Sequence, residues 1–262
     1  MSYQINNRVE AKIDLAALER NLGRIRSKLP SGIRYISVVK ADAYGHGLAP
    51  MATRLMQSGA DAFAVANVQE GKRLRELGSG WPILILSPTL PREYPDLMDA
   101  QLTPSLSAAW EIEKLEALAN ERKTSLPVHL LVDTGMGRAG IWHEEANGLY
   151  QKILHAKGLE LRGIFTHFSS ADTDPEYTDL QRRRFLELLD AWQIEADTKL
   201  WIHADNSASV QSFHADQRFN AVRIGLLQFG LSQLKESILG SLQTEAVLSF
   251  RTQICLIKNL PT

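Results

Sequence analysis

The first residue that could do chemistry is Lys40, which stands where an apolar run gives way to polar residues. The stretch is ISVVKADAYGHG, residues 36–47, with Tyr44 and His46 following the lysine. A lysine at such an edge can extend its ammonium into water along an apolar surface. Held in a partly apolar site, the same amine can instead attack a carbonyl carbon. Polar residues elsewhere in the sequence help to decide between the two.

Other apolar runs also end in polar side chains: Asp133 and Arg138, Thr166 and His167, His203 with Asp205, Asn206 and Ser207, and Arg223 with Gly225. Each alone has an ordinary structural explanation. An arginine can pair with a carboxylate, a histidine can lie satisfied in a core, and Asn206-Ser207 can cap a helix. None of these explanations requires the residues to share a location. If the run ends meet, the residues form a site.

The chemistry of such a site would centre on an amine. A strand-end lysine can form a Schiff base with an aldehyde, including that of pyridoxal 5'-phosphate (PLP). The phosphate would need hydroxyls and backbone N–H groups, which Ser207 and the Gly225–Leu226 turn could supply. A class I aldolase would also use a lysine, and it is the competing interpretation.

Eight apolar, β-branched runs could position these residues, and helical stretches separate most of them. The runs are 35–41, 62–67, 82–88, 102–107, 128–134, 161–168, 199–206 and 220–225. Alternating strands and amphipathic helices predict parallel βαβ units, and eight units predict an α/β fold of the (β/α)₈ TIM-barrel type. An open doubly wound sheet would normally carry a glycine-rich turn after its first strand, whereas this first strand ends in a lysine.

The two ends of the sequence differ from the repeating part. AKIDLAALERNLGRIRSKL, residues 11–29, has helical spacing with Asp14 as a plausible N-cap. EAVLSFRTQICLIKNL, residues 245–260, has a β-like pattern. We expect a barrel over residues 1–240 and the beginning of an incomplete C-terminal β module over residues 241–262. Within that segment we expect Cys255 to be a small buried side chain.

The composition excludes several classes of protein. The 262 residues carry a net charge of −1, which would not attract nucleic acid or an anionic membrane. The cluster Arg182-Arg183-Arg184 is interpreted as a solvated helix face. We find neither a secretory signal nor a membrane-spanning run, and a single cysteine suits a reducing compartment, so a cytoplasmic protein is expected. No metal site is predicted.

The motifs together resemble the alanine racemase family of PLP enzymes with a barrel fold. VVKADAYGHG, VDTGMGRAG, THFSSAD, HADNSA and VRIGLLQFG stand in the family's order at nearly its spacing. The resemblance implies PLP-dependent interconversion of L- and D-alanine, which supplies a cell-wall precursor. Serine or another small amino acid remains an open alternative as substrate. A single-domain PLP-binding protein that serves cofactor homeostasis is the alternative function.

The resemblance also implies roles for individual residues. Lys40 would carry PLP and act as one of two proton-transfer groups, and Arg138 would lie near the phenolic oxygen. Arg223 would face the pyridine nitrogen, with His167 and His203 behind it. The implied catalytic residues are Lys40, Arg138, His167 and Arg223. The implied cofactor-binding residues are Lys40, Tyr44, His203, Asn206, Ser207, Arg223, Gly225 and Leu226.

Two departures from the family pattern affect these expectations. Leu131 stands where the family frequently has a carbamylated lysine that supports the arginine corresponding to Arg138. The family's second proton-transfer group is a tyrosine of a C-terminal β domain, contributed across a dimer, and this sequence ends before that segment. We therefore expect firm PLP binding, weak or absent turnover by this chain alone, and a monomer or weak homodimer.

Overall fold

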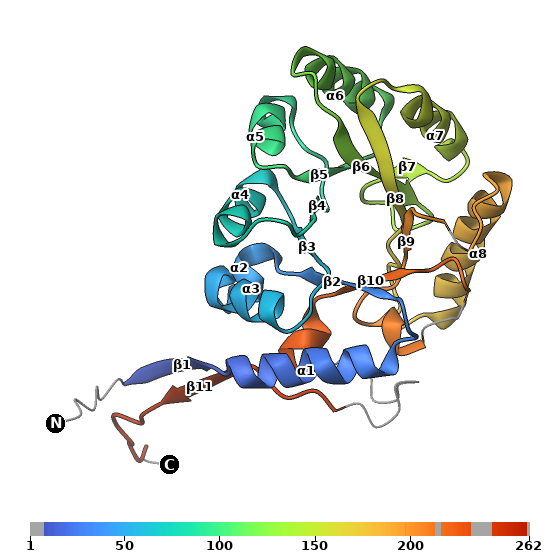
Figure 1. The fold of residues 1–262 in the computed structure, drawn as a ribbon. Helices are drawn as coiled ribbons and strands as arrows, with labels where there is room; N and C mark the ends of the chain where they lie inside the picture. The colour runs from blue at the N-terminus through green and yellow to red at the C-terminus, as the bar shows by residue number, and fades with distance from the viewer. Residues whose placement is uncertain (1–7, 197, 213–215, 232–242, 261–262) are drawn as a thin grey trace.

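Eight parallel strands form a nearly closed ring at the centre of this computed structural model (Figure 1). The structure describes residues 8–196, 198–212, 216–231 and 243–260. Hydrogen-bonded neighbours follow the order β10-β2-β3-β4-β5-β6-β8-β9. Asn220 N–H donates to Ile202 O at 3.1 Å and Arg223 N–H donates to Asp205 O at 2.9 Å, which joins the two ends of the ring. The predicted (β/α)₈ barrel is confirmed.

Each predicted run overlaps one strand of the ring. The strands are β2 Arg34–Val38, β3 Ala62–Val65, β4 Ile83–Ile85, β5 Thr103–Leu106, β6 Leu126–Asp133, β8 Leu159–Phe165, β9 Trp201–His203 and β10 Ala221–Ile224. The short strand β7, Ile141–Trp142, pairs with β6 outside the ring. Most strands end before the predicted run does, because the last residues of each run leave the ladder and turn into the following loop.

Helices surround the ring (Figure 1). The α-helical segments are α1 Leu15–Lys28, α2 Lys40–Gly45, α3 Leu48–Gln57, α4 Val68–Leu77, α5 Tyr94–Asp99, α6 Ala109–Glu121, α7 Ala146–His155 and α8 Pro175–Ala191. Short 3₁₀ segments are η1 Pro91–Glu93, η2 Ser209–Ser212 and η3 Leu226–Phe229. No helix among the described residues is both long enough and apolar enough to cross a bilayer.

The strands are buried on both faces, which explains why their sequences read as continuous apolar runs. In β2, Ile36 and Val38 belong to an apolar cluster that also contains Leu84 and Phe165 from other strands of the ring. Tyr35 of the same strand belongs to the larger cluster that the strands share with the helices. Successive side chains point to opposite faces, so one strand contributes to both cores.

The first helix begins at Leu15, directly after its predicted N-cap. Asp14 is the N-cap, as expected, and its carboxylate accepts hydrogen bonds from the N–H groups of Ala16 and Ala17. Residues 11–13 belong instead to strand β1, Val9–Ile13, which pairs antiparallel with β11, Leu248–Thr252. The predicted β-like C-terminal segment therefore does contain a strand. The expected domain boundary at 240/241 lies outside the described residues.

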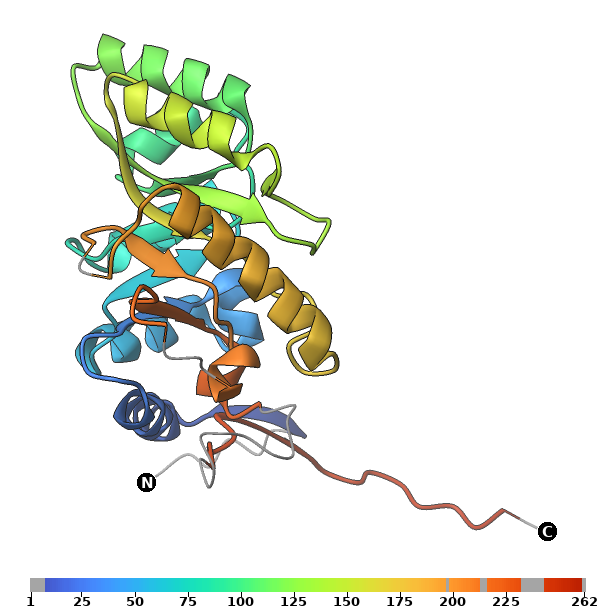
Figure 2. The ribbon, with the colours of Figure 1, turned by 90° about the vertical axis from the view of Figure 1, so that its right-hand side faces the viewer.

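The expectation of a buried Cys255 is wrong, because its side chain is exposed. Past β11 the chain runs away from the barrel (Figure 2), and Ile254 and Ile257 are 80% and 79% exposed. An apolar pattern indicates burial only where another element covers it. No described element covers this segment.

The expected solvated face at 182–184 is also wrong for two of the three arginines. Arg182 is buried, with Nη2 at 3.6 Å from a carboxylate oxygen of Asp205 and its guanidinium over the Phe168 ring. Arg184 donates to Thr134 O at 2.9 Å. Only Arg183 is exposed. Helix α8 packs this face against the loops that follow β6 and β9, so its charges lie against the barrel.

Candidate active site

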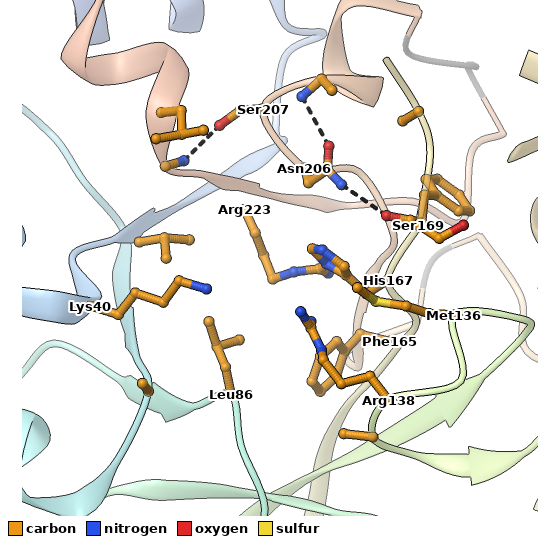
Figure 3. Close-up of a pocket in the computed structure, with 18 of the residues that line it drawn as sticks. Lys40, Leu86, Met136, Arg138, Phe165, His167, Ser169, Asn206, Ser207 and Arg223 are labelled. Atoms are coloured by element: carbon orange, nitrogen blue, oxygen red, sulfur yellow. Dashed lines mark hydrogen bonds between the residues drawn. The ribbon is translucent and has the colours of Figure 1, made fainter. Parts of the chain in front are cut away.

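The carboxyl ends of the ring strands surround a cavity of about 510 Å³. Figure 3 shows Lys40, Arg138, His167 and Arg223 converging on it from different segments of the chain. Of the residues singled out in the sequence, the cavity lining includes Lys40, Tyr44, Leu131, Arg138, His167, Asn206, Ser207, Arg223, Gly225 and Leu226. His46 and His203 are absent from the lining. His46 stacks on Phe229, with ring centroids 4.7 Å apart.

The backbone takes a left-handed turn directly after Lys40. Segment α2 contains four consecutive non-glycine residues with φ of 52–54°, from Ala41 to Tyr44. Each costs about 1–2 kcal/mol relative to the right-handed conformation, so the turn needs support from its surroundings. Asp42 provides part of it, since its carboxylate accepts the Leu48 N–H at 2.8 Å and its carbonyl accepts the Gly47 N–H at 3.0 Å. The turn places Tyr44 in the same cavity as Lys40.

Arg223 is 3% exposed and is held by a dense set of acceptors. Nη1 donates to Nδ1 of His203 at 2.7 Å and to its carbonyl at 3.0 Å. Nη2 donates to Thr166 O at 2.7 Å and to Ala204 O at 2.8 Å, and lies 3.3 Å from Nδ1 of His167. Both terminal nitrogens are thus committed to the protein. In the described part of the chain no acceptor is found for Nε, so its N–H is the donor left for a ligand.

The charge on Arg223 persists at neutral pH although the group is buried. Burial lowers the pKa of Arg223 to about 10, with Asp205 acting against this effect and Arg138 adding to it. The guanidinium therefore remains a cation that only donates hydrogen bonds. Because Arg223 lines the cavity, the part of the site beside it suits an unprotonated hydrogen-bond acceptor on a ligand.

The histidines near Arg223 are neutral. Burial and then the charge of Arg223 lower the pKa of His129 to about 3 and that of His203 well below its usual value. Burial, Arg223, Arg138 and Lys40 lower the pKa of His167 to about 3. Since Nδ1 of His203 accepts from Arg223, its proton belongs on Nε2, which lies 3.1 Å from Nδ1 of His129. His203 thus lies behind Arg223 and supports it.

Arg138 faces the cavity from the loop after β6, and it is exposed. Within the described ranges its guanidinium makes no hydrogen bond or ion pair. The loop that carries it is nevertheless ordered, because the Asp133 carboxylate accepts the N–H groups of Gly135, Met136 and Gly137 at 2.8–3.2 Å. Tyr177 of α8 donates its hydroxyl to Gly135 O at 2.7 Å. The backbone positions Arg138 while its charge stays open to an anion.

Leu131 lines the cavity as an apolar residue and is 4% exposed. It packs in the inner cluster of the barrel with Phe165, Leu86 and Ala139. The structure therefore confirms that position 131 offers no anion to Arg138. The cavity therefore has an apolar wall at this position.

The loops after β9 and β10 form a polar cradle at another edge of the cavity. Ser207 Oγ accepts the N–H groups of Gly225 at 2.8 Å and Leu227 at 3.3 Å. A Cβ atom on Gly225 would lie 2.7 Å from the hydroxyl of Tyr44, so this close approach requires glycine. Asn206 orders the loop, since Oδ1 accepts the Ala208 N–H at 2.9 Å. Hydroxyls and backbone amides gather at this edge of the cavity.

Several lining residues were not anticipated from the sequence: Leu86, Ser87, Pro88, Met136, Phe165, Ser169 and Asp172. Leu86, Ser87 and Pro88 directly follow strand β4, so the rule that located Lys40 and His167 at strand ends would have found them. Met136 and Asp172 come from the interiors of loops. No periodicity marks such positions.

The geometry defines a (β/α)₈ barrel with a cavity at the carboxyl ends of its strands, to which the described residues contribute Lys40, Arg138 and Arg223. Comparison with known proteins identifies the family within this class. Residues 13–233 match the family model for the alanine racemase N-terminal domain. The chain therefore belongs to the alanine racemase family.

Two curated relatives and two solved structures illustrate the similarity. The chain is 35% identical to alanine racemase of Halothermothrix orenii over all of this chain and 69% of that protein. It is 35% identical to that of Geobacter sulfurreducens over 95% of this chain and 65% of the relative. Alanine racemase of Clostridium difficile in complex with cycloserine superposes with a TM-score of 0.87 at 30% identity, covering 98% of this chain and 71% of that one. Alanine racemase of Bacillus anthracis with bound L-Ala-P superposes with a TM-score of 0.83 at 32% identity, covering 94% of this chain and 64% of that one. The chain spans about two thirds of the length of the curated relatives it matches.

Proposed function

We propose that this chain binds PLP through Lys40 and takes part in the interconversion of L- and D-alanine. The observation that carries the proposal is the shared cavity. Lys40, the uncommitted Nε–H of Arg223, and the cradle formed by Ser207 and Gly225 all border it. The comparisons support the choice of alanine, since the relatives are alanine racemases and one solved relative holds L-Ala-P.

The residues present fit the functional groups of PLP. Its aldehyde would meet Lys40, its ring nitrogen would meet Arg223, and its phenolic oxygen would lie near Arg138. Its phosphate would occupy the cradle, with donors from Tyr44, Ser207 and the backbone of Gly225 and Leu226. The Gly225 N–H would exchange its bond to Ser207 Oγ for one to the phosphate. The absence of a side chain at Gly225 leaves room for the Tyr44 hydroxyl there. A volume of about 510 Å³ is also in the usual range for a cofactor site.

Arg223 would control how strongly the bound ring withdraws electrons. When bound, PLP draws electrons from the amino acid's Cα and so acidifies its Cα–H bond. Arg223 can only donate a hydrogen bond to the ring nitrogen and therefore holds it unprotonated. An unprotonated ring withdraws electrons less strongly, which limits the lifetime of negative charge on the substrate. This favours return of the proton to Cα and hence racemisation over transamination.

Lys40 would act as a proton-transfer group on one face of the substrate. Burial and then the charge of Arg138 lower the pKa of Lys40, with Glu70 acting against them, so the amine loses its proton more easily than in water. Racemisation also needs a group on the opposite face. Among the described tyrosines the cavity lining contains Tyr44, which the proposal assigns to phosphate. These residues therefore supply one of the two groups, and the family's tyrosine from a C-terminal β domain would supply the other.

Chiral chromatography of alanine after incubation with the PLP-loaded protein tests the proposal. We expect the wild-type chain to retain PLP and to convert alanine slowly. This conversion should be lost in Lys40→Ala. Retention of PLP at Lys40 without any conversion would favour the alternative, a PLP-binding protein without turnover. Conversion that persists in Lys40→Ala would contradict the assignment of Lys40. Serine offered in parallel distinguishes the two small substrates.

A further inference from the structure

We propose that Glu70 is a positioning residue for Lys40, because its carboxylate anchors the backbone next to Lys40 and places a negative charge beside that segment. The inference rests on the proposed function, in which Lys40 is the reactive amine. Glu70 is not among the residues that the sequence indicated. Its role depends on contacts between two separate βα units.

The two carboxylate oxygens of Glu70 accept hydrogen bonds from different units of the barrel. Oε1 accepts the N–H of Ala41, the residue after Lys40, at 2.8 Å. Oε2 accepts the N–H of Ala66, directly after strand β3, at 2.8 Å. Glu70 itself is fixed in the first turn of α4, whose N-cap Asn67 accepts its N–H at 3.0 Å. The carboxylate thus joins the end of β2 to the end of β3.

Glu111 provides a direct comparison within the same chain. It stands in the first turn of α6, as Glu70 does in α4. Its Oε2 accepts the N–H groups of Ser107 at 2.6 Å and Ala108 at 2.8 Å, so both bonds stay within one βα unit. Both glutamates cap the loop before their own helix. Only Glu70 of this pair also reaches the neighbouring unit, where it meets the residue after Lys40.

The segment that Glu70 reaches is one that needs an anchor. Ala41 is the first of the four left-handed residues, and its N–H is used by Glu70 rather than by the turn itself. A backbone in this sparsely populated conformation persists only where its surroundings hold it. The bond from Glu70 fixes the peptide immediately after Lys40, and hence the direction in which the amine leaves the backbone.

Charged groups of both signs surround Lys40. Arg138 from the loop after β6 and Arg223 from β10 line the same cavity. His167 and the carboxyl group of Asp172, both from the loop after β8, line it too, as does the Tyr44 hydroxyl on the segment of Lys40 itself. Burial and Arg138 lower the pKa of Lys40, and Glu70 acts in the opposite direction. Removing the Glu70 charge while keeping the side chain's length should therefore make the amine lose its proton at lower pH.

Competitive acylation of the PLP-free chain with acetic anhydride tests the proposal, with labelling of Lys40 read by peptide mass spectrometry across a pH series. In Glu70→Gln, we expect the midpoint of Lys40 labelling to fall by about 0.5 pH unit, which is about a threefold rise in labelling below the midpoint. Glu111→Gln, the matched control, should leave the midpoint unchanged. An unchanged midpoint in Glu70→Gln would overturn the proposal. So would a rise, because it would mean that Lys40 had only been released into water.

Hydrogen exchange at the Ala41 amide provides a second test that needs no variant. In the wild-type chain we expect this amide to exchange more slowly than solvent-exposed amides. Exchange as fast as an exposed amide would overturn the anchoring role. Neither experiment uses PLP, so failure of PLP to attach at Lys40 would refute the proposed function without affecting these readouts.

Discussion

Nη1 of Arg223 donates a hydrogen bond of 2.7 Å to Nδ1 of His203, and this bond fixes both groups. It sets the proton of His203 on Nε2, which lies 3.1 Å from Nδ1 of His129. It also commits one end of the guanidinium to the barrel interior, where His203 stacks on Phe165 at a centroid distance of 4.7 Å. The orientation of Nε–H toward the cavity follows from this arrangement.

Replacing His203 by leucine should destabilise the fold by about 2–3 kcal/mol, because it leaves a donor of a buried cation without its acceptor. The imidazole is fully buried, so water cannot take its place. Urea denaturation measures the change in the free energy of unfolding. His155→Leu is the control, since His155 is exposed at the end of α7 and should shift stability by less than about 0.5 kcal/mol. Equal effects of the two changes would contradict the account.

Stability should fall as the pH is lowered from neutrality. The pKa values of His129 and His167 are lowered to about 3 in the folded chain, whereas an unfolded histidine titrates near about 6.5. Below that value the unfolded chain binds protons that the folded chain does not. The free energy of unfolding should then drop by about 1.4 kcal/mol per pH unit for each such histidine, until the folded pKa is reached.

Urea titrations near pH 6 and near pH 5 measure this slope, in a window above the range in which most carboxylates titrate. The His129→Gln variant should have a slope smaller by about 1.4 kcal/mol per pH unit, because one of the buried neutral histidines is gone. A slope equal to that of the wild type would show that His129 binds its proton equally well in both states.

The barrel was predictable because its strands are buried on both faces. Ile36 and Val38 face the interior while Tyr35 faces the helices, so the run stays apolar throughout and stands out from the amphipathic helices around it. The same criterion was misleading at Cys255, where an apolar run has no described element over it. The charge-cluster criterion was misleading at Arg182, whose burial depends on Asp205, a residue distant in the sequence.

The candidate site was predictable where its residues sit at strand ends. Lys40, His167 and Arg223 each follow or end an apolar run, and parallel strands bring such positions to one edge. The left-handed turn from Ala41 to Tyr44 had no signal, because alanine and tyrosine rarely adopt this conformation. The hydrogen bond from Ala41 N–H to Glu70 also had no signal in the sequence, because it joins two separate βα units that meet only in the folded barrel.

Replacing Gly225 by alanine should weaken PLP binding by about tenfold, which corresponds to about 1.4 kcal/mol. The added Cβ would lie 2.7 Å from the Tyr44 hydroxyl and would displace it from the cradle. Gly148→Ala is the control, because a Cβ there meets nothing within 4 Å and lies in helix α7. Fluorescence titration with PLP measures both dissociation constants. Equal affinity in the two variants would contradict the cradle as the phosphate site.

Attachment of PLP to Lys40 is the central claim, and borohydride reduction of the PLP-loaded chain tests it most directly. Reduction fixes the cofactor to its amine, and peptide mass spectrometry then locates the added mass. We expect a single modified peptide that contains Lys40, and no modification of this peptide in Lys40→Ala. Modification of other lysines with Lys40 unmodified would contradict this claim.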